Sequence, residues 1–492
     1  MSPYRNFFLS CLLALSYNTV VAQAQLGLRT ENYAGIHSLF LNPASVAATY
    51  PLAWDLNLIS GGLAVGNNIA FVKDANLFTV KNNARYIGPA PALKMPFLFE
   101  GTPKLYYDFF NDSRSKFFSA VAEGMLPSFL INLESGHSWG LFAQARGQAS
   151  GFELPHVINR YRYMTYSADS AIKIEPFSLA AMTWAEAGLN YGYQIELDKS
   201  YMSIGLTLKK LWGFSGAYLQ NAGDTRFAKQ FIDSVELKSI AIETAYTGNL
   251  QTDPTRVTGS GFSVDFGAVF IPNGTPTDYS WKFGISFHDL GSIRFTDSAS
   301  WYRFEQKKVD KRVSFNDLHS IDQSDGIPAA LKDLNALFVD KQHPIAFTRS
   351  NQFSVILPSR MHLFADYRIA NLETFNQEGA FFVQGLWVQP IRAAANQVMS
   401  DAIVAITPRY ESRWWSASLP ISFYNWQQTR WGLSLRAAFL TIGSDYMSSL
   451  FYKGRFDGTN FYMALKINPF TIGKWAKSER SSGNGSAKCY RF

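Results

Sequence analysis

Large apolar side chains alternate with small or polar ones along most of this chain. The pattern is clearest in residues 189–197, 202–208, 262–270, 281–287, 431–439 and 461–467. A period of two is that of a β-strand, whose successive side chains point to opposite faces. Strands of this length with one apolar and one polar face are typical of a wall between lipid and a lumen. The alternation therefore predicts an antiparallel transmembrane β-barrel.

Fourteen segments fit this pattern, and their connections sort into two sets. We predict strands at 52–72, 127–134, 138–149, 186–197, 201–213, 261–271, 280–290, 352–357, 361–370, 378–389, 402–410, 413–423, 430–440 and 459–469. With both chain ends in the periplasm, the outer connections are 73–126, 150–185, 214–260, 291–351, 371–377, 411–412 and 441–458. The inner connections are 135–137, 198–200, 272–279, 358–360, 390–401 and 424–429. Long extracellular loops, short periplasmic turns and an even strand number are typical of bacterial barrels.

The composition favours a membrane protein. Hydrophobic residues make up 47% of the chain and charged residues only 17%, whereas soluble domains carry about 25% charged residues. Beyond the N-terminal region there is no run of about 18 apolar residues, so helical membrane spans are not expected. Many tryptophans fall near predicted strand ends, as aromatic girdles require. A soluble β-sandwich with an aromatic core is the alternative.

The N-terminus has the features of an export signal. Arg5 gives a basic start, Phe7–Leu15 an apolar run and Ala22-Gln23-Ala24 a small-residue cleavage site before Gln25. We therefore predict a signal peptide at 1–24, an N-terminal plug segment at 25–50, a barrel at 51–470 and a flexible C-terminal tail at 471–492.

No motif indicates catalysis, a metal or a cofactor. The cysteines are Cys11, which leaves with the signal unless it accepts a lipid, and Cys489, so no intramolecular disulfide or multi-cysteine metal site is expected. The histidines form no HExxH pair, and no GxSxG elbow occurs. Ser286 and His288 share a strand face, but Asp289 should point to the other face and cannot orient the imidazole. We expect no enzyme.

The predicted plug contains a turn and an apolar cluster. Its candidate residues are Gly35, Ile36, Leu39, Phe40, Asn42, Pro43 and Ala44. Pro43 fixes its own φ, Asn42 can bond the backbone just beyond it, and Gly35 permits a tight bend. The apolar members would pack on the inner wall, which suggests a partly apolar chamber that suits a lipid-like ligand. The alternative is a plug that only seals and stabilises.

Charged residues of both signs are expected to face the lumen. The candidates are Glu196, Lys209, Asp265, Lys282, Asp366, Arg368 and Arg436. They can pair with one another and fill the interior, or line a polar, mildly cationic conduit. The sequence does not separate these two readings.

Two connections have features of their own. Apolar residues at helical spacing in 327–338 predict a short amphipathic helix that packs on the barrel mouth or binds a partner. Residues 156–166 interleave arginines with tyrosines, which could stack on sugars or bases. An exposed aromatic loop or upper girdle is the favoured interpretation of this pattern, and nucleic acid is not an expected partner.

Three segments resemble known outer-membrane proteins. Residues 32–45 (NYAGIHSLFLNPAS), 353–369 and 443–470 resemble an uncharacterised barrel family of Bacteroidota-type bacteria. The tripeptide Asn42-Pro43-Ala44 before the first strand resembles the N-terminal segment of FadL-type fatty-acid transporters. Those transporters are fourteen-stranded barrels with an N-terminal hatch. The same tripeptide resembles the N-terminal Asn-Pro-Ala segments of type IX secretion barrels of the PorV and PorP kinds.

The resemblance implies an outer-membrane barrel with a plug for passive passage of small hydrophobic or amphipathic molecules. The alternative is a non-transporting accessory or secretion-linked subunit. The expected partners are outer-membrane lipid, a small hydrophobic ligand and proteins that bind the extracellular loops.

Overall fold

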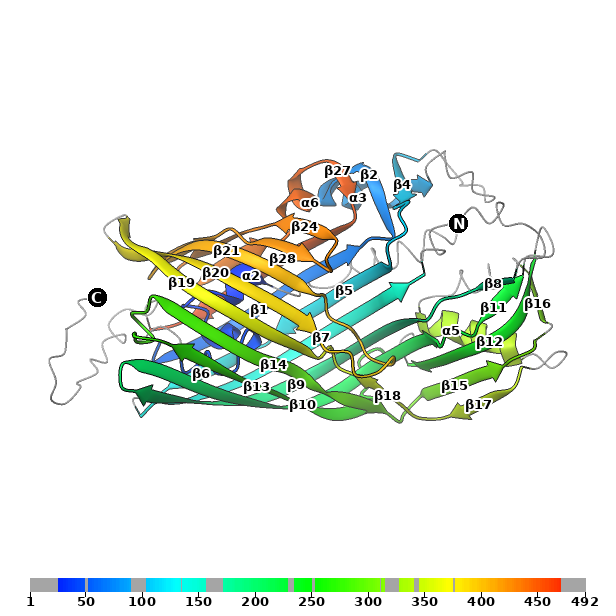
Figure 1. The fold of residues 1–492 in the computed structure, drawn as a ribbon, viewed down its shortest axis with the longest axis horizontal. Helices are drawn as coiled ribbons and strands as arrows, with labels where there is room; N and C mark the ends of the chain where they lie inside the picture. Colours follow the sequence, from blue (N-terminus) through cyan, green and yellow to red (C-terminus); the bar gives the residue numbers. More distant parts are fainter. Residues whose placement is uncertain are drawn as a thin grey trace.

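A closed barrel of fourteen antiparallel strands forms the body of the molecule in the computed structural model (Figure 1). The structure describes residues 25–48, 52–89, 103–133, 135–155, 171–228, 234–249, 253–309, 311–314, 327–339, 345–374 and 377–469. The predicted signal peptide, the 156–166 segment, the C-terminal tail and Cys489 lie outside the described residues.

The first half of the barrel wall consists of long strands. They are β1 (Trp54–Asn67), β5 (Lys116–Met125) continued by β6 (Ser128–Asn132), β7 (His137–Leu154), β9 (Phe177–Leu197), β10 (Ser200–Asn221), β13 (Gly259–Ile271) and β14 (Trp281–Phe295). β5 and β6 form one wall position, because both pair with β1 on one side and β7 on the other.

The second half contains several interrupted strands. They are β18 (Phe353–Ile356) continued by β19 (Arg360–Thr374), β20 (Gln377–Pro390), β21 (Ile403–Ser412), β22 (Trp415–Ser418) with β23 (Ile421–Tyr424), β24 (Gln428–Trp431) with β25 (Leu433–Ala437), β26 (Leu440–Ser444) and β28 (Gly458–Ile467). β28 pairs with β1 from Leu56↔Ile467 to Gly66↔Gly458. This last pairing closes the barrel and leaves no free edge.

The predicted strand number is confirmed, but two errors in the prediction cancelled. Segments 352–357 and 361–370 were counted as two strands, whereas β18 and β19 both pair antiparallel with β14 and form one wall position around Pro358. Residues 430–440 were counted as one strand, whereas the chain reverses at Ala438, which has φ 50°, and β26 pairs back with β25.

These corrections move several connections to the other end of the barrel. Connections 371–377 and 411–412 were predicted outside, but they lie at the inner end, where both chain termini of the barrel and the short turns are. Connections 358–360, 390–401 and 424–429 were predicted inside. The first is an interruption within a strand, and the other two lie at the outer end with the long connections.

The outward side chains form an apolar belt. Leu206, Phe266, Ile285, Trp387 and Ile406 are all exposed, whereas their strand neighbours are buried or half-buried. An exposed apolar belt on a closed barrel is the surface that lipid covers, and it contradicts the alternative of a soluble sandwich. Among the described residues, no helix is both long and apolar enough to span a bilayer.

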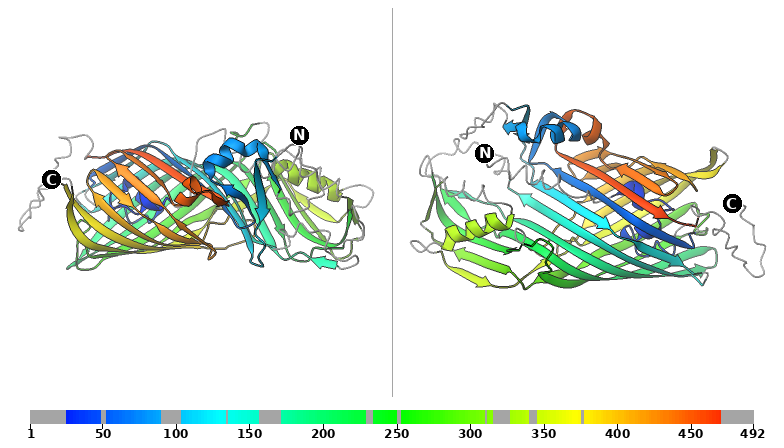
Figure 2. Two further views of the ribbon diagram at one scale, coloured as in Figure 1. Left: turned by 90° about the horizontal axis from the view of Figure 1, so that it is seen from above. Right: turned by 180° about the vertical axis from the view of Figure 1, so that it is seen from behind.

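An extension stands beyond the outer end of β10. It consists of β8 (Ala171–Lys173), β11 (Arg226–Ala228), β12 (Ser234–Thr247), β15 (Ala299–Gln306), β16 (Lys311–Ser314), β17 (Phe347–Ser350) and α5 (Ile327–Val339). The predicted helix is confirmed as α5. Leu331 and Phe338 pack against the sheet of this extension, so the apolar face of α5 is covered within the chain. Figure 2 shows α5 beside the strands of the extension.

A second, smaller structure stands at the outer ends of β1 and β28. It consists of a sheet of β2 (Ala70–Ala75), β3 (Ile87–Pro89), β4 (Leu105–Phe109) and β27 (Gly454–Phe456), with α3 (Leu77–Asn83), η2 (Ala84–Tyr86) and α6 (Met447–Phe451). We call it the cap sheet. Its apolar core includes Val72, Val80, Ile87 and Phe456.

Candidate functional site in the barrel interior

Residues 25–48, the N-terminal segment, are surrounded by barrel strands. The segment contains α2 (Leu26–Arg29) and η1 (Gly35–Phe40), and all of its residues except Ala47 are buried. Its hydrogen bonds reach residues of β1, β5, β9, β13, β14, β19, β21, β22, β25 and β28. Figure 1 shows α2 within the outline of these strands.

Gly35 makes the bend that begins the second half of this segment. Its φ is +59°, and a Cβ atom there would lie 2.2 Å from the Asp55 carboxylate. That carboxylate accepts the Ile36 N–H at 2.9 Å and is fully buried. Because only glycine has neither the φ penalty nor the collision, this position requires glycine.

The turn at Asn42-Pro43-Ala44 has the predicted hydrogen bond. The Asn42 Oδ1 atom accepts the Ala44 N–H at 2.9 Å. The Asn42 amide also donates to the carbonyls of Ala268 at 3.0 Å and Ile285 at 2.9 Å, so it bridges β13 and β14. Glycines make room on the wall, since a Cβ at Gly267 would lie 2.3 Å from Asn42 Oδ1.

Three side chains converge on the carbonyl oxygen of Leu41. Ser286 Oγ lies at 2.8 Å, His362 Nδ1 at 3.0 Å and His288 Nε2 at 3.1 Å from it. All three side chains are buried. This bundle of polar contacts fixes the turn against β14 and β19.

Ser286 and His288 are arranged as in part of a hydrolytic triad. Their Oγ and Nε2 atoms are 2.9 Å apart, and His288 Nδ1 is 3.7 Å from Asp265 Oδ2. However, Ser286 Oγ is fully buried and already donates to the Leu41 carbonyl. The position that a substrate carbonyl would need is occupied by the chain itself, so the cluster holds the segment in place.

The expectation that Asp289 points away from His288 is wrong. Asp289 has φ 57°, and the ladder between β13 and β14 shifts register at this point. The resulting bulge turns both side chains inward, where each is 1% exposed. The Asp289 carboxylate then accepts from Arg146 at 3.0 Å, Lys209 at 2.5 Å and Arg360 at 2.6 Å.

Ion pairs hold the N-terminal segment to one side of the wall, which we call the polar arc (β25, β26, β28, β1 and β5). Arg436 Nε donates to Glu31 at 2.8 Å, and Arg29 pairs with Glu123. Lys466 Nζ donates to the carbonyls of Tyr33 at 2.8 Å and Ala34 at 3.0 Å. These groups are buried, so each charge depends on its partner for solvation.

Asp445, in the connection after β26, anchors the start of the segment. Its carboxylate accepts the Leu26 N–H and the Tyr462 hydroxyl, each at 3.2 Å. Burial raises the pKa of the Asp445 carboxyl to about 6. The neutral form of this group is therefore favoured compared with an exposed aspartate.

Most of the charged residues predicted to face the lumen form ion pairs inside the barrel, and two lie at its inner end. Lys209 pairs with Asp265 at 2.7 Å, Lys282 lies 3.9 Å from Asp366, and Arg436 binds Glu31. Arg368 instead pairs with exposed Asp278 in the β13–β14 turn, and Glu196 is exposed at the inner end of β9. The interior candidates are thus paired within the chain.

Sequence reasoning missed several of the strongest partners. They are Glu123, Asp289, Arg360, His362, Arg409 and Glu411. Arg409 forms a two-bond contact with Asp366 at 2.8 and 2.7 Å, and Glu411 accepts the Asn32 N–H at 3.1 Å. Their inward orientation on β21 was detectable from the alternation of Thr407, Arg409 and Glu411.

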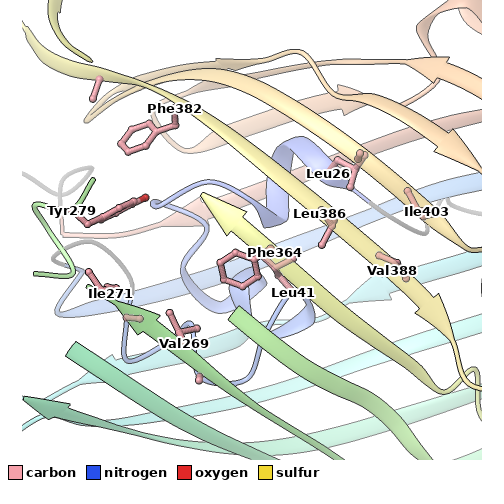
Figure 3. Packing of buried hydrophobic residues seen from close by; sticks show 14 of the residues in the cluster. Leu26, Leu41, Val269, Ile271, Tyr279, Phe364, Phe382, Leu386, Val388 and Ile403 are labelled. Atoms are coloured by element: carbon pink, nitrogen blue, oxygen red, sulfur yellow. The ribbon is translucent and has the colours of Figure 1, made fainter. Parts of the chain in front are cut away.

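Part of the wall opposite the polar arc carries apolar side chains beside its charged ones. Inward side chains of β13, β19, β20 and β21, which we call the apolar arc, form one cluster with residues of the N-terminal segment (Figure 3). Leu26, Leu41, Ala44 and Ala48 of the segment lie against Val269, Phe364, Leu386, Val388 and Ile403 of the wall. The expected apolar inner surface is thus present on one side of the interior.

Little free space remains where the two arcs meet. A cavity of about 30 Å³ lies between Leu26, Phe40 and Leu41 of the segment and the wall. The charged residues Arg146, Glu123 and Arg360 line it together with Leu386, Val388 and Ile403. It has room for about one water molecule. In the described residues, no group of three or more His, Cys, Asp or Glu side chains could hold a metal ion.

The chain was compared with known proteins. Residues 47–445 match the family model described as "Family of unknown function (DUF5723)". No curated protein matches the chain. Similar solved structures include the toluene transporter TbuX of Ralstonia pickettii, at 8% identity and TM-score 0.37, covering 88% of this chain and 94% of that one.

Two further structures show similar coverage. A mutant of the monoaromatic hydrocarbon channel TodX has 8% identity and TM-score 0.38, over 89% of this chain and 94% of that one. The translocator domain of the autotransporter NalP from Neisseria meningitidis has 6% identity and TM-score 0.34, over 89% and 96%. The resemblances to Bacteroidota-type proteins and to the PorV and PorP kinds stay predictions.

Proposed function

This chain belongs to the DUF5723 family of unknown function, and we propose that it is a plugged channel for passive passage of small hydrophobic or amphipathic molecules. The closed barrel and its apolar belt make it an outer-membrane protein. The observation that carries the proposal is the apolar arc inside a barrel whose other inner walls are polar.

The apolar arc is suited to hydrophobic molecules because its partners belong to a separate element. Leu26 and Leu41 of the segment pack in one cluster with Leu386, Val388 and Ile403 of the wall. Displacement of the N-terminal segment would leave an apolar inner surface that a hydrophobic molecule can bind in its place. We therefore assign the segment the role of a plug.

The border of the apolar arc suits an amphipathic molecule with an anionic group. Arg146 and Arg360 line the small cavity together with Leu386 and Val388. A ligand that enters from the outer end would meet guanidinium groups and an apolar wall side by side. Guanidinium groups bind carboxylates and phosphates through paired hydrogen bonds.

Flux measurements on reconstituted protein test this proposal. Wild type, a variant lacking residues 25–48 and the same deletion with Leu386→Asn are placed in vesicles. The deletion should open a conductance and speed entry of a hydrophobic fluorescent dye. Leu386→Asn should slow the dye while leaving ion conductance unchanged, and Ser418→Ala on a polar wall strand is the matched control. A deletion variant that assembles but passes neither ions nor dye would refute the channel.

A second candidate is a non-transporting accessory subunit that binds protein partners. The extension of β11, β12, β15–β17 and α5 beyond the outer end favours it, because a channel needs no such structure. The dense buried bonding of the N-terminal segment favours it too. A pull-down from native membranes with and without this extension distinguishes the two, since only the accessory role requires a stable protein partner.

A further inference from the structure

The cap sheet exposes a cluster of aromatic side chains. Phe78 on α3 is 53% exposed, Phe451 on α6 is 67% exposed and Tyr452 is 72% exposed. The rings of Phe78 and Phe451 are 6.3 Å apart between centroids, and the Asn76 amide donates to the Phe451 carbonyl at 3.3 Å. We call these three residues the aromatic patch. A contiguous exposed patch of this kind marks an interaction surface.

Side-chain bonds tie the base of the cap sheet to the edge of the lipid-facing wall. The Asn68 amide donates to Gln427 at 2.6 Å, and the Gln428 amide donates to Asp457 at 3.1 Å. Between β23 and β24, this same outer turn carries Trp426, which is 57% exposed. An exposed tryptophan at the end of a membrane strand marks the interface between hydrocarbon and headgroups.

The helix that ends at Phe451 lies beside the barrel wall. In Figure 1, α6 projects from the barrel beside β24, and it lies nearer to the end marked C than β4 does. α6 also contacts β24 and β28. Phe451 and Tyr452 are therefore close to the level of Trp426 rather than at the far outer end.

Two lysines lie close to the patch residues in the sequence. Lys81 follows Phe78 by three positions on α3, so the two side chains share a helix face. Lys453 is exposed directly after Tyr452. Residues 75–86 and 446–456 contain no Asp or Glu. Cations beside exposed aromatic rings are the combination that binds an anionic membrane surface.

We propose that the aromatic patch with Lys81 and Lys453 is a membrane anchor that binds anionic lipids of the outer leaflet. The rings of Phe451 and Tyr452 insert at the boundary between headgroups and acyl chains. The two ammonium groups bind lipid phosphates. The anchor fixes the short wall of β24, β26 and β28 against the bilayer and does not depend on what the barrel conducts.

Spin labelling of the full chain in vesicles tests the anchor. A nitroxide is attached at Phe451→Cys in a Cys489→Ser background, and its accessibility to oxygen and to a water-soluble nickel chelate is measured. The label at position 451 should be more accessible to oxygen than to the chelate, because oxygen concentrates in lipid. The control is Phe347→Cys on β17, which is 40% exposed in the outer extension, where the chelate should dominate. A label at Tyr452→Cys gives a second reading if the first variant assembles poorly.

The charge requirement is tested with lipid composition. Adding phosphatidylglycerol to phosphatidylcholine vesicles should shift the 451 label further toward oxygen. Lys81→Glu with Lys453→Glu should abolish this shift, since each near-surface lysine contributes about fivefold to binding of anionic lipid. The proposal would be overturned if the label at position 451 had the same accessibility to oxygen and chelate as the label at position 347. It would also be overturned if phosphatidylglycerol left the accessibility at position 451 unchanged. Protection of the patch only in native membranes would point to a protein partner and would also overturn it.

Discussion

The polar arc and the apolar arc hold the same N-terminal segment by different forces. Arg436, Lys466 and Asp55 bind it through directional bonds whose geometry allows one position. Leu386 and Ile403 bind it through contact area, which tolerates sliding. Directional bonds therefore determine where the segment sits, mainly from the polar arc and also from His362 of β19 and Glu411 of β21, whereas the apolar side chains of the apolar arc contribute stability without fixing its position.

The largest effect is expected from breaking the polar arc at Arg436. Arg436→Ala leaves the Glu31 carboxylate buried without its guanidinium, which should cost about 3–5 kcal/mol of unfolding free energy. Trypsin should then cleave after Arg29 in the assembled barrel. Urea unfolding followed by gel migration, with the protease assay, measures both.

The matched control for this pair removes both charges. Glu31→Gln with Arg436→Met should recover most of the lost stability, because no unpaired charge remains. Wild-type stability of the single Arg436→Ala variant would show that this ion pair does not hold the segment.

A smaller loss is expected from breaking the apolar arc. Leu386→Ala should lower the unfolding free energy by about 2–4 kcal/mol through the cavity it leaves. Arg29 should stay protected from trypsin, because the directional bonds of the polar arc remain. Val383→Ala, on the lipid-facing side of the same strand, should cost less. Cleavage at Arg29 in Leu386→Ala would contradict the division of roles between the arcs.

Gly35→Ala tests whether the bend in the N-terminal segment requires glycine. The positive φ and the nearness of the Asp55 carboxylate should together cost about 1–3 kcal/mol. Gly124→Ala on β5 is a control without either constraint, since nothing lies within 4 Å of its added Cβ. Equal stability of the two variants in urea unfolding would argue against strain at Gly35.

The last prediction concerns pH. The folded pKa of Asp445 is raised to about 6 from an ordinary value of 3.8. Between these values the folded state binds more protons than the unfolded state, so stability decreases as pH rises through this window. Asp445→Asn should flatten this part of the pH profile. A profile identical to that of wild type would show that the carboxyl does not titrate in this range.

Sequence periodicity predicted the barrel because most strands that face lipid alternate apolar outward side chains with small or polar inward ones. It failed where that alternation is weak. On β5, the outward residues include Ala120, Ala122 and Gly124, and the inward ones include Phe117 and Val121. Small residues face lipid and large ones face the interior, so the segment was assigned to a loop and Glu123 was missed as a partner of Arg29.

The segment itself was easier to predict than its partners. Gly35 and Asn42 have local roles, a positive φ and an Asx bond, that depend on neighbours in sequence. Asp289 faces inward only because a bulge shifts the β14 register, and Arg436 meets Glu31 only after the barrel closes. Such long-range geometry leaves no periodic trace in one sequence.

The buried bonds of the N-terminal segment also constrain the order of assembly. Lys466 and Tyr33 are 433 positions apart in the chain, and Arg436 and Glu31 are 405 apart. The segment is the first part of the described chain, but two of its partners lie on β25 and β28, at the far end of the chain. An unfinished barrel thus leaves Glu31 in water and Arg29 open to periplasmic proteases. Burial of the N-terminal segment therefore reports that the last strands of the barrel are in place.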